Sequence, residues 1–408
     1  FNASVSNGFS GRLPCTCKHE KYKGLNIMFR FLTAGESHGQ CLTALVEGIP
    51  AGLKINLDEI NRQMARRQKG YGRGGRMSIE TDKADILSGV RFGETMGDPI
   101  TLRVVNKDWE NWTDRMSVMG TPTWTKVTAA RPGHADYVGI KKYNREDIRD
   151  ILERSSARET AARVAAGAVA RQFLEACGIK IVSHVINIGG VKANTDNIDY
   201  ANLQPNDSDL NCNDAQAEAK MREAIRDAGQ AGDTLGGTFE VIVQNMPIGV
   251  GSHIQWDKRL DMQLAGAMMS IQAIKGVEIG DGFDYGNHPG SQLHDEMFYN
   301  EDKTVYRKTN HAGGIEGGMS NGEPIIVRAC MKPIPTLMTP LHSIDIESKQ
   351  EVLACKERSD VCAVQAASVV GEAMVALAIT KALIPKFGSA CMADVLQNLQ
   401  AYNDRTKA

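Results

Sequence analysis

The segment from residue 66 to residue 76, RRQKGYGRGGR, places five cations in eleven positions of a chain whose formal net charge is only −2. Glycines between the cations let the backbone turn tightly, so guanidinium groups can converge on one small polyanion and bind phosphate or carboxylate bidentately. A solvated basic face, or an RGG-like contact with RNA, is the alternative interpretation of the same charges. The five cations are Arg66, Arg67, Lys69, Arg73 and Arg76.

The same segment contains the spacing G-x-G-x-x-G at Gly70, Gly72 and Gly75. In a dinucleotide-binding fold this spacing follows a strand and opens a helix. Here it follows a helical pattern and leads into the strand-like stretch MSIET. No Gly-Lys dipeptide occurs, so a Walker A loop is absent as well. The sequence therefore argues against both kinds of nucleotide-binding loop.

Two histidines stand in short glycine motifs, His38 in GESHG and His134 in RPGHAD. A single histidine is more often a structural hydrogen-bonding residue than a catalyst. Here each ring is expected on a tight turn beside acids or cations, where neighbours can move its pKa through neutrality. Two such turns indicate an acid–base pair. There is no HExxH motif and no cluster of Cys and His, so no metal site is expected.

A further cation-rich stretch, ERSSARET, begins a long helical pattern. Arg154, Ser155, Ser156 and Arg158 would surround free backbone N–H groups at the positive end of the helix dipole, which favours an anion. A plain capping box from Ser156 to Glu159, with arginines on the surface, is an equal alternative.

A similar combination occurs in KERSDVCAV, near the C-terminus. Arg358, Ser359 and Asp360 place a cation, a hydroxyl and a carboxylate before the last predicted helix. The simpler interpretation of such an aspartate is an N-cap.

Periodicity predicts an alternation of helices and strands without an obvious linker. The first helix carries Leu57, Ile60 and Met64 on one face and ends at Gly70, and a strand pattern opens near Met28. Paired glycines, such as 189/190 and 236/237, indicate tight loops. The other predicted helices span about 155–178, 257–275 and 363–383, and the predicted strands lie within 179–191 and 236–251.

Composition indicates an ordinary globular protein of 408 residues, with 42% hydrophobic and 24% charged residues. A pI near 6.6 argues against a protein that coats nucleic acid. Nine dispersed cysteines favour reduced thiols and a cytoplasmic location, and no apolar run suggests a membrane span. Residues 1–27 are expected to be a disordered N-terminal extension or a remnant of cloning, and 28–408 a single folded domain.

Seven motifs together resemble chorismate synthase in order and approximate spacing, over essentially all of residues 28–400. They are GESHG, RRQKGYGRGGR, RPGHAD, RSSARETAARVAAGAVA, GGIEGGMSNGEPI, MKPIPT and RSDVCAV. This resemblance implies a carbon–oxygen lyase that converts 5-enolpyruvylshikimate 3-phosphate into chorismate and phosphate by anti-1,4-elimination. That reaction is the last step of the shikimate pathway, which supplies aromatic amino acid biosynthesis, and it requires reduced FMN without net redox change.

The resemblance also implies roles for individual residues. His38 would act as an acid near the flavin, His134 as a proton donor to the leaving phosphate or the flavin, and Asp360 would help the flavin accept the substrate proton. Substrate binding is implied for Arg67, Arg73, Arg76 and Arg158. FMN binding is implied for Arg67, Arg73, Arg154, Ser155, Ser156, Gln272, Ala273, Gly317, Lys332, Pro333, Ile334, Pro335, Thr336 and Arg358.

The family's fold is an α+β fold, a β-α-β sandwich with long core helices between antiparallel sheets, assembled as a homotetramer. NADPH would serve only as a flavin reductant, and an external flavin reductase is a possible partner. Neither nucleic acid nor a membrane is an expected partner. Two alternative functions are considered. One is RNA binding, which the 6% aromatic content disfavours, and the other is a flavin oxidoreductase that transfers a net hydride.

Overall fold

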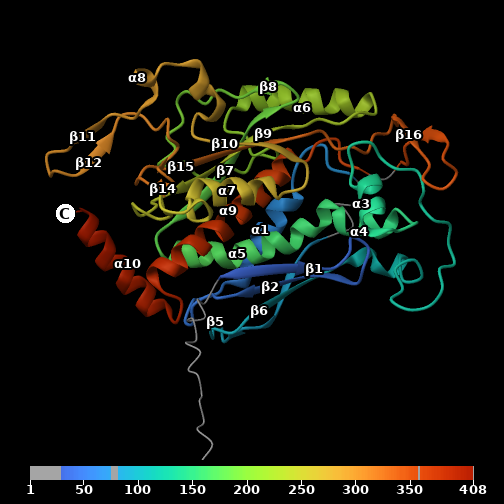
Figure 1. The fold of residues 1–408 in the computed structure, drawn as a ribbon, viewed down its shortest axis with the longest axis horizontal. Coiled ribbons are helices and arrows are strands. Elements are labelled where there is room, and N and C mark those ends of the chain that lie inside the picture. The colour runs from blue at the N-terminus through green and yellow to red at the C-terminus, as the bar shows by residue number, and fades with distance from the viewer. Residues whose placement is uncertain (1–28, 75–80, 357–358, 408) are drawn as a thin grey trace, which may run out of the picture.

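The structure is a computed structural model, and it describes residues 29–74, 81–356 and 359–407. The predicted N-terminal extension, Arg76 and Arg358 lie outside the described residues. Figure 1 shows two antiparallel sheets with a group of helices between them. The α+β prediction is therefore confirmed.

The smaller sheet has the strand order β1-β2-β6-β3, and all its pairings are antiparallel. Alternate residues of β2 and β6 are buried, among them Leu42, Val46 and Leu102, which is the period-two pattern of a sheet with one face on the core. The strands are β1 (Arg30–Ala34), β2 (Cys41–Glu47), β3 (Ala84–Ser88) and β6 (Ile100–Val105).

The larger sheet has the order β10-β15-β9-β7-β8 and is also antiparallel. Gly189 and Gly190, at φ +58° and +89°, form the two-residue turn between β7 and β8, as the paired glycines predict. The strands are β7 (Lys180–Ile188), β8 (Val191–Lys192), β9 (Gly237–Gln244), β10 (Ile274–Ile279) and β15 (Ile325–Met331).

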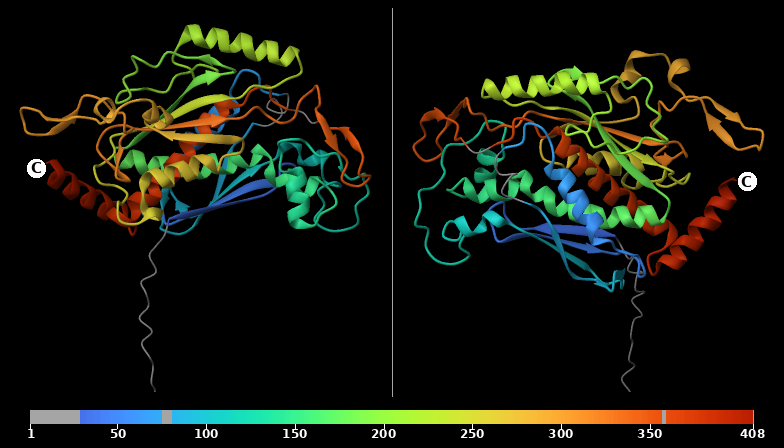
Figure 2. Two further views of the ribbon diagram at one scale, coloured as in Figure 1. Left: turned by 45° about the horizontal axis from the view of Figure 1, so that its top comes forward. Right: turned by 180° about the vertical axis from the view of Figure 1, so that it is seen from behind.

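Helices α1, α5 and α9 fill the layer between the two sheets in Figure 1, and Figure 2 shows the same layering from two other directions. Helix α5 contacts β2 and β6 of the smaller sheet and β7 of the larger one, whereas α9 contacts β7 and β9. Helix α7 packs on α9 and β10. The helices are α1 (Leu57–Gln68), α5 (Thr160–Ala176), α7 (Leu260–Met269) and α9 (Val364–Phe387).

Helix α9 is buried along most of its length, because helices or sheet surround it on several sides. Within the described residues it is the one helix long and apolar enough to cross a membrane, but 89% of that stretch is buried inside the protein. It crosses α5 very closely. A Cβ added to Gly167 of α5 would lie 2.4 Å from Cβ of Ala373 in α9, so this crossing requires glycine.

Further elements surround this core. The helical ones are η1 (Lys107–Asn111), α3 (Asp136–Tyr143), α4 (Arg149–Ser155), η2 (Ala157–Glu159), α6 (Ala215–Gln230), η3 (Trp256–Lys258), η4 (Gly282–Asn287), α8 (Gly290–Leu293) and α10 (Met392–Lys407). The short strands are β4 (Val90–Arg91), β5 (Glu94–Thr95), β11 (Met297–Tyr299), β12 (Val305–Arg307), β13 (Ile315–Glu316), β14 (Met319–Ser320), β16 (His342–Ile344) and β17 (Glu351–Leu353).

Two predicted helices are wrong in part. The helix expected over 155–178 is divided, because Ser156 is extended at ψ 140° between α4 and η2, and α5 begins only at Thr160. The helix expected over 257–275 ends at Met269, because Ala273 adopts φ +68° as the chain turns into β10. The predictions for 56–70 and 363–383 correspond closely to α1 and α9.

Candidate active site

The glycine–arginine loop after α1 lies against the segment just before α9. Gly72 has φ +84°, and its carbonyl accepts a 2.8 Å hydrogen bond from the Val361 N–H. A Cβ on Gly74 would lie 2.8 Å from the Ser359 carbonyl, so the two backbones touch only because residue 74 is glycine. These contacts join two segments that are almost 290 positions apart in the sequence.

The loop brings Arg73 to Asp360, as the sequence predicts for two residues of one site. Arg73 Nη1 lies 3.2 Å from Asp360 Oδ2, and Asp360 Oδ1 accepts a 2.6 Å hydrogen bond from the Gly74 N–H. The alternative role of Asp360 as an N-cap is wrong, because α9 begins after Ala363 and Asp360 contacts the loop. The carboxylate is thus held beside a guanidinium group at the edge of the loop.

Arg67 and Arg158 share the carboxylate of Asp82 in the protein interior. Arg67 Nη2 and Arg158 Nη1 each lie 2.6 Å from one of its oxygens. Burial by itself raises the pKa of Asp82, but the two guanidinium groups outweigh burial and lower it overall. Two buried cations around one anion leave an excess positive charge.

This buried charge has capacity for an additional anion. Burial lowers the pKa of Arg67 to about 10, against the opposing attraction of Asp82, so the guanidinium stays charged at neutral pH. Nε of Arg67 is buried and finds no hydrogen-bond acceptor among the described residues. An anionic ligand at this position would supply the missing acceptor.

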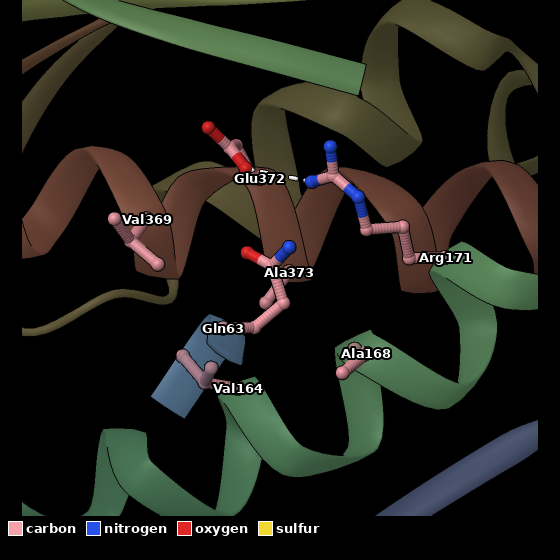
Figure 3. A pocket seen from close by; sticks show the side chains of 8 residues that line it. Gln63, Val164, Ala168, Arg171, Val369, Glu372 and Ala373 are labelled. Carbon is pink, nitrogen blue, oxygen red and sulfur yellow. Dashed lines mark hydrogen bonds and ion pairs between the residues drawn. The ribbon is translucent and has the colours of Figure 1, made fainter. Parts of the chain in front are cut away.

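Arg66, which was not among the predicted substrate-binding residues, does not belong to this group. Its side chain turns into the helix layer and forms a bidentate pair with Glu372 of α9, at 2.6 and 2.8 Å. Glu372 also pairs with Arg171 of α5 at 2.7 Å, as Figure 3 shows, and accepts from the Ser183 hydroxyl. This network fixes the C-terminal end of α1 to α5 and α9, and thereby the root of the loop.

His38 lies on the turn between β1 and β2, and Glu153 of α4 holds it. Its Nδ1 is 2.9 Å from Glu153 Oε1, and its backbone N–H donates to Oε2 of the same carboxylate at 2.8 Å. The indole of Trp112 stacks on the imidazole, with ring centroids 3.9 Å apart. Arg149 donates to Glu153 at 2.9 Å and covers the Trp112 ring. The tight turn predicted around His38 is therefore built partly from a distant helix.

His134 lies in a turn closed by Arg131 and Asp136. Nδ1 of His134 is 2.5 Å from Asp136 Oδ1, and the Arg131 guanidinium binds both oxygens of the same carboxylate, at 2.8 and 3.0 Å. Burial by itself raises the pKa of Asp136, but hydrogen bonds from His134 and Arg131 hold it well below its usual range. The imidazole is partly exposed, with 17% of its side-chain surface accessible.

Asn106 links the His38 turn to the buried arginines. Its amide nitrogen donates to the carbonyls of Gly39 at 2.7 Å and Glu36 at 3.1 Å, and its amide oxygen accepts from Arg158 Nε at 2.9 Å. Sequence reasoning missed Asn106, Asp82 and Glu153. Asp82 and Asn106 belong to no sequence motif, and Glu153, although it opens the stretch ERSSARET, shows no local sign of its contact with His38.

The anion seat predicted at a single helix start is wrong in its geometry. Arg154 and Ser155 lie in the last turn of α4, where carbonyl groups point along the axis, and not at an N-terminus. Arg154 instead donates to the carbonyls of Thr33 and Gly35 beside the His38 turn. Ser156 accepts from the Arg158 N–H and lies 3.2 Å from the Ser37 hydroxyl, so the expected capping box to Glu159 is not formed.

The run from Lys332 to Thr336 forms a third part of the site. The Lys332 N–H donates to the Ala273 carbonyl at 2.9 Å, which places Ala273 and its neighbour Gln272 beside this run. Thr336 Oγ1 accepts from Arg131 at 3.3 Å, and Lys332 Nζ reaches the Gly133 carbonyl. The run therefore adjoins the His134 turn, and Gln272 reaches back to Glu159 near α5.

A hollow of about 350 Å³ opens between this run and the His134 turn. Sequence reasoning also missed Thr234, whose hydroxyl donates to the Ile334 carbonyl. The N–H of the next residue, Leu235, donates to the carbonyl of Val361, so this strand of chain connects the Lys332–Thr336 run to the segment before α9. In the sequence, the only indication of a special conformation near Thr234 was the glycine pair 236/237, which predicted a tight loop. The hollow is lined by Pro132, Gly133, Asp233, Thr234, Lys332, Pro333, Ile334, Pro335, Leu337 and Leu341.

Gly317 lies apart from the other predicted FMN residues. Its neighbour Gly318 accepts hydrogen bonds from Ser252 and from Leu260 at the start of α7, whereas Gln272 follows the end of that helix. Ten helical residues separate those ends by roughly 15 Å. Within one chain, Gly317 therefore does not join the group around Lys332.

Comparison with known proteins shows the family of the chain. Residues 29–384 match the family model for chorismate synthase. A chorismate synthase from Geobacter sulfurreducens is 53% identical over 392 residues, covering 93% of this chain and all of the relative. One from Syntrophotalea carbinolica is 55% identical over 379 residues, covering 92% of this chain and 98% of the relative.

A solved structure shows the same similarity in three dimensions. The crystal structure of a chorismate synthase superimposes with a TM-score of 0.75 and 43% sequence identity, covering 93% of this chain and 98% of that one. Both the sequence and the fold agree over nearly the whole length. The chain therefore belongs to the chorismate synthase family.

Proposed function

We propose that this protein converts 5-enolpyruvylshikimate 3-phosphate into chorismate and phosphate by anti-1,4-elimination with reduced FMN. Membership of the family makes it a lyase that acts on a phosphate ester in the last step of the shikimate pathway. The observation that carries the proposal is the buried cation excess around Asp82, next to Arg73 and Asp360. A substrate with two carboxylates and a phosphate suits such a site.

The cationic residues have a defined task in this reaction. The carbon–oxygen bond to phosphate breaks while a proton is lost from C6, so negative charge accumulates on the departing phosphate. Arg67, Arg73 and Arg158, together with Arg76, would bind the substrate and stabilise that charge. The hydrogen bonds that hold Arg67 and Arg158 to Asp82 mean that these two side chains need little reorganisation when the bond breaks.

The residues near Lys332 suit a bound flavin. The hollow of about 350 Å³ has mostly apolar walls with one ammonium group, of Lys332, and one carboxylate, of Asp233. Outside the hollow, Arg67 Nε lacks an acceptor among the described residues. When bound, reduced FMN supplies electron density that eases phosphate departure and regains it as the C6 hydrogen leaves. Cofactor binding is proposed for Arg67, Arg73, Arg154, Ser155, Ser156, Gln272, Ala273, Lys332, Pro333, Ile334, Pro335, Thr336, Arg358 and Gly317.

Proton placement falls to three side chains. His38 would donate a proton near the flavin, and His134 would donate to the leaving phosphate or to the flavin. Asp360 would help the flavin accept the proton from the substrate. The contacts of His38 with Glu153 and of His134 with Asp136 support these roles, because each fixes the orientation of an imidazole within the site.

The finer features of the family are proposals for this chain. We infer a single catalytic domain over 28–408, a β-α-β sandwich, a homotetramer and a cytoplasmic location. The separation of Gly317 from Gln272 supports an assembly, because a second subunit could bring Gly317 to the flavin. NADPH would act only by reducing FMN, and an external flavin reductase could do so.

The test is anaerobic turnover. Purified protein is supplied with 5-enolpyruvylshikimate 3-phosphate and dithionite-reduced FMN, and chorismate is detected by chromatography. We expect chorismate from the unmodified protein, and a kcat lower by roughly 10²- to 10⁴-fold for His38→Ala and for His134→Ala. Turnover near the unmodified rate in both variants would remove the acid–base assignment.

A further inference from the structure

Both histidines of the site are held by the same arrangement of side chains, although the two arrangements are unrelated in sequence. In each, a buried carboxylate contacts Nδ1 of the imidazole and also binds an arginine. Glu153 serves His38 from 115 positions away, whereas Asp136 serves His134 from two positions away. The recurrence of one geometry in two unrelated segments indicates a shared requirement of the site.

We propose that Glu153 and Asp136 are positioning residues that keep His38 and His134 protonated at Nδ1, so that each ring handles its catalytic proton through Nε2. This inference rests on the proposed acid–base roles of the two histidines. Neither carboxylate is among the residues that the family resemblance assigns to substrate or cofactor.

The geometry supports this in three ways. First, Glu153 and Asp136 are nearly inaccessible, with 3% and 0% of their side chains exposed, so water does not compete for these contacts. Second, burial raises the pKa of Glu153 but the His38 and Arg149 contacts outweigh it, so the carboxylate stays an ionised acceptor. An ionised carboxylate can only accept, so the nitrogen that faces it must carry hydrogen.

Third, the orientation of each ring is fixed by more than one contact. Glu153 binds the backbone N–H of His38 as well as Nδ1, and Trp112 covers one face of the ring. Asp136 likewise accepts from the Arg131 backbone at 3.1 Å and from its guanidinium, and Arg131 Nη2 also lies 3.1 Å from Nδ1 and 3.4 Å from Nε2 of His134. Rotation of either ring would break a charge-assisted hydrogen bond in a buried setting.

An arginine also holds each of the two carboxylates in place. Arg149 and Arg131 each share the negative charge of their carboxylate, which reduces the share available to the ring. Charged groups from other segments also face the two sites: Arg115 over Trp112, and Lys332 at the Gly133 carbonyl. Each carboxylate, and with it the orientation of the imidazole, is thereby fixed from a second side.

The test measures tautomers and rates on the full-length protein. Solid-state ¹⁵N spectra of histidine-labelled protein, assigned by difference with His38→Gln and His134→Gln, report which ring nitrogen carries hydrogen at alkaline pH. We expect Nδ1–H for both rings. An Nε2–H signal from either ring in the unmodified protein would overturn the proposal for that histidine, whether or not any other variant folds.

Glu153→Gln and Asp136→Asn then connect the tautomer to the reaction. An amide can donate as well as accept, so we expect a mixture of tautomers and a kcat lower by roughly 10- to 10³-fold, with KM for substrate within about threefold. Asp150→Asn is the control. Asp150 lies in α4, like Glu153, and the substitution removes its exposed ion pair with Arg145, which precedes the helix. It should change neither quantity.

The outcomes separate this inference from the proposed function. Changed tautomers with unchanged kcat would refute positioning but leave the lyase activity intact. Unmodified protein that makes no chorismate would refute the proposed function, while the ring tautomers could still be read. A KM increase that accounts for the whole loss in either variant would show that the carboxylate only supports substrate binding, and would also refute the proposal.

Discussion

The crossing of α5 and α9 at Gly167 allows a stability prediction whose sign can be worked out from the structure. In Gly167→Ala, the new Cβ would lie 2.4 Å from Ala373 Cβ, 2.6 Å from its Cα and 2.9 Å from its carbonyl oxygen. Carbon atoms pack best about 3.5–4.0 Å apart, so the helices must separate by roughly 1 Å. None of the three atoms belongs to a flexible side chain that could rotate away.

Two opposing terms set the magnitude. Inserting a methyl group into a filled core costs about 1–3 kcal/mol, and the rigidity of these neighbours argues for the upper end. Alanine recovers about 1 kcal/mol of helix propensity. We therefore expect Gly167→Ala to lower the free energy of unfolding by roughly 2 kcal/mol.

Gly266, in α7, provides the matched control. It is exposed, and a Cβ there meets no atom within 4 Å. Gly266→Ala should therefore gain up to about 1 kcal/mol from helix propensity alone. Urea unfolding followed by circular dichroism, at one protein concentration, should give midpoints on opposite sides of the unmodified protein. A midpoint for Gly167→Ala equal to or above that of Gly266→Ala would refute the close crossing.

Three further predictions concern the site and its frame. Burial by itself raises the pKa of Glu372, but Arg66 and Arg171 outweigh burial and lower this pKa from 4.5 to about 2. A depressed carboxyl pKa stabilises the fold above pH 4.5, and this stabilisation is lost as the pH falls towards 2. Urea unfolding at a series of pH values should therefore show a loss of ~3 kcal/mol in the free energy of unfolding of the unmodified protein, and a smaller loss in Glu372→Gln. Thr234→Val should weaken FMN binding roughly 5-fold in a fluorescence titration and Thr234→Ser should not, because only the hydroxyl bonds Ile334. Arg73→Lys should raise KM for substrate by a factor that varies with salt, and a salt-independent increase would indicate altered loop folding instead. For Glu372, an equally steep acid loss in the variant would contradict the pairing, and for Thr234, equal affinities of the two variants would contradict the hydroxyl contact.

Local sequence patterns predicted the elements that depend on local physics. Asn56 caps α1 by accepting from the N–H groups of Asp58 and Glu59, and the charged turn at the other end stops at Gly70. The helix over 363–383 and the tight turn at Gly189 and Gly190 were predicted from local sequence patterns in the same way. Helix α10 was not predicted, although its buried residues Met392, Val395 and Leu399 have the same spacing as Leu57, Ile60 and Met64 of α1.

Tertiary contacts decided what the sequence pattern could not. The pattern around Ser156 is helical on both sides, yet the chain is extended there, where Ser37 donates to the Glu153 carbonyl and lies beside Ser156. Contacts with the His38 turn thus prevail over helix propensity. The partners of the catalytic candidates, such as Glu153 and Asp82, follow from the same long-range packing and leave no local signal.

The stoichiometry of turnover tests the central claim most directly. Limiting reduced FMN, excess 5-enolpyruvylshikimate 3-phosphate and NADPH are incubated anaerobically with the protein, and phosphate, chorismate and NADPH are quantified together. The account predicts equal amounts of phosphate and chorismate over many turnovers per flavin, with no NADPH consumed in proportion. Consumption of one NADPH per product, or chorismate formation without equal phosphate release, would contradict it.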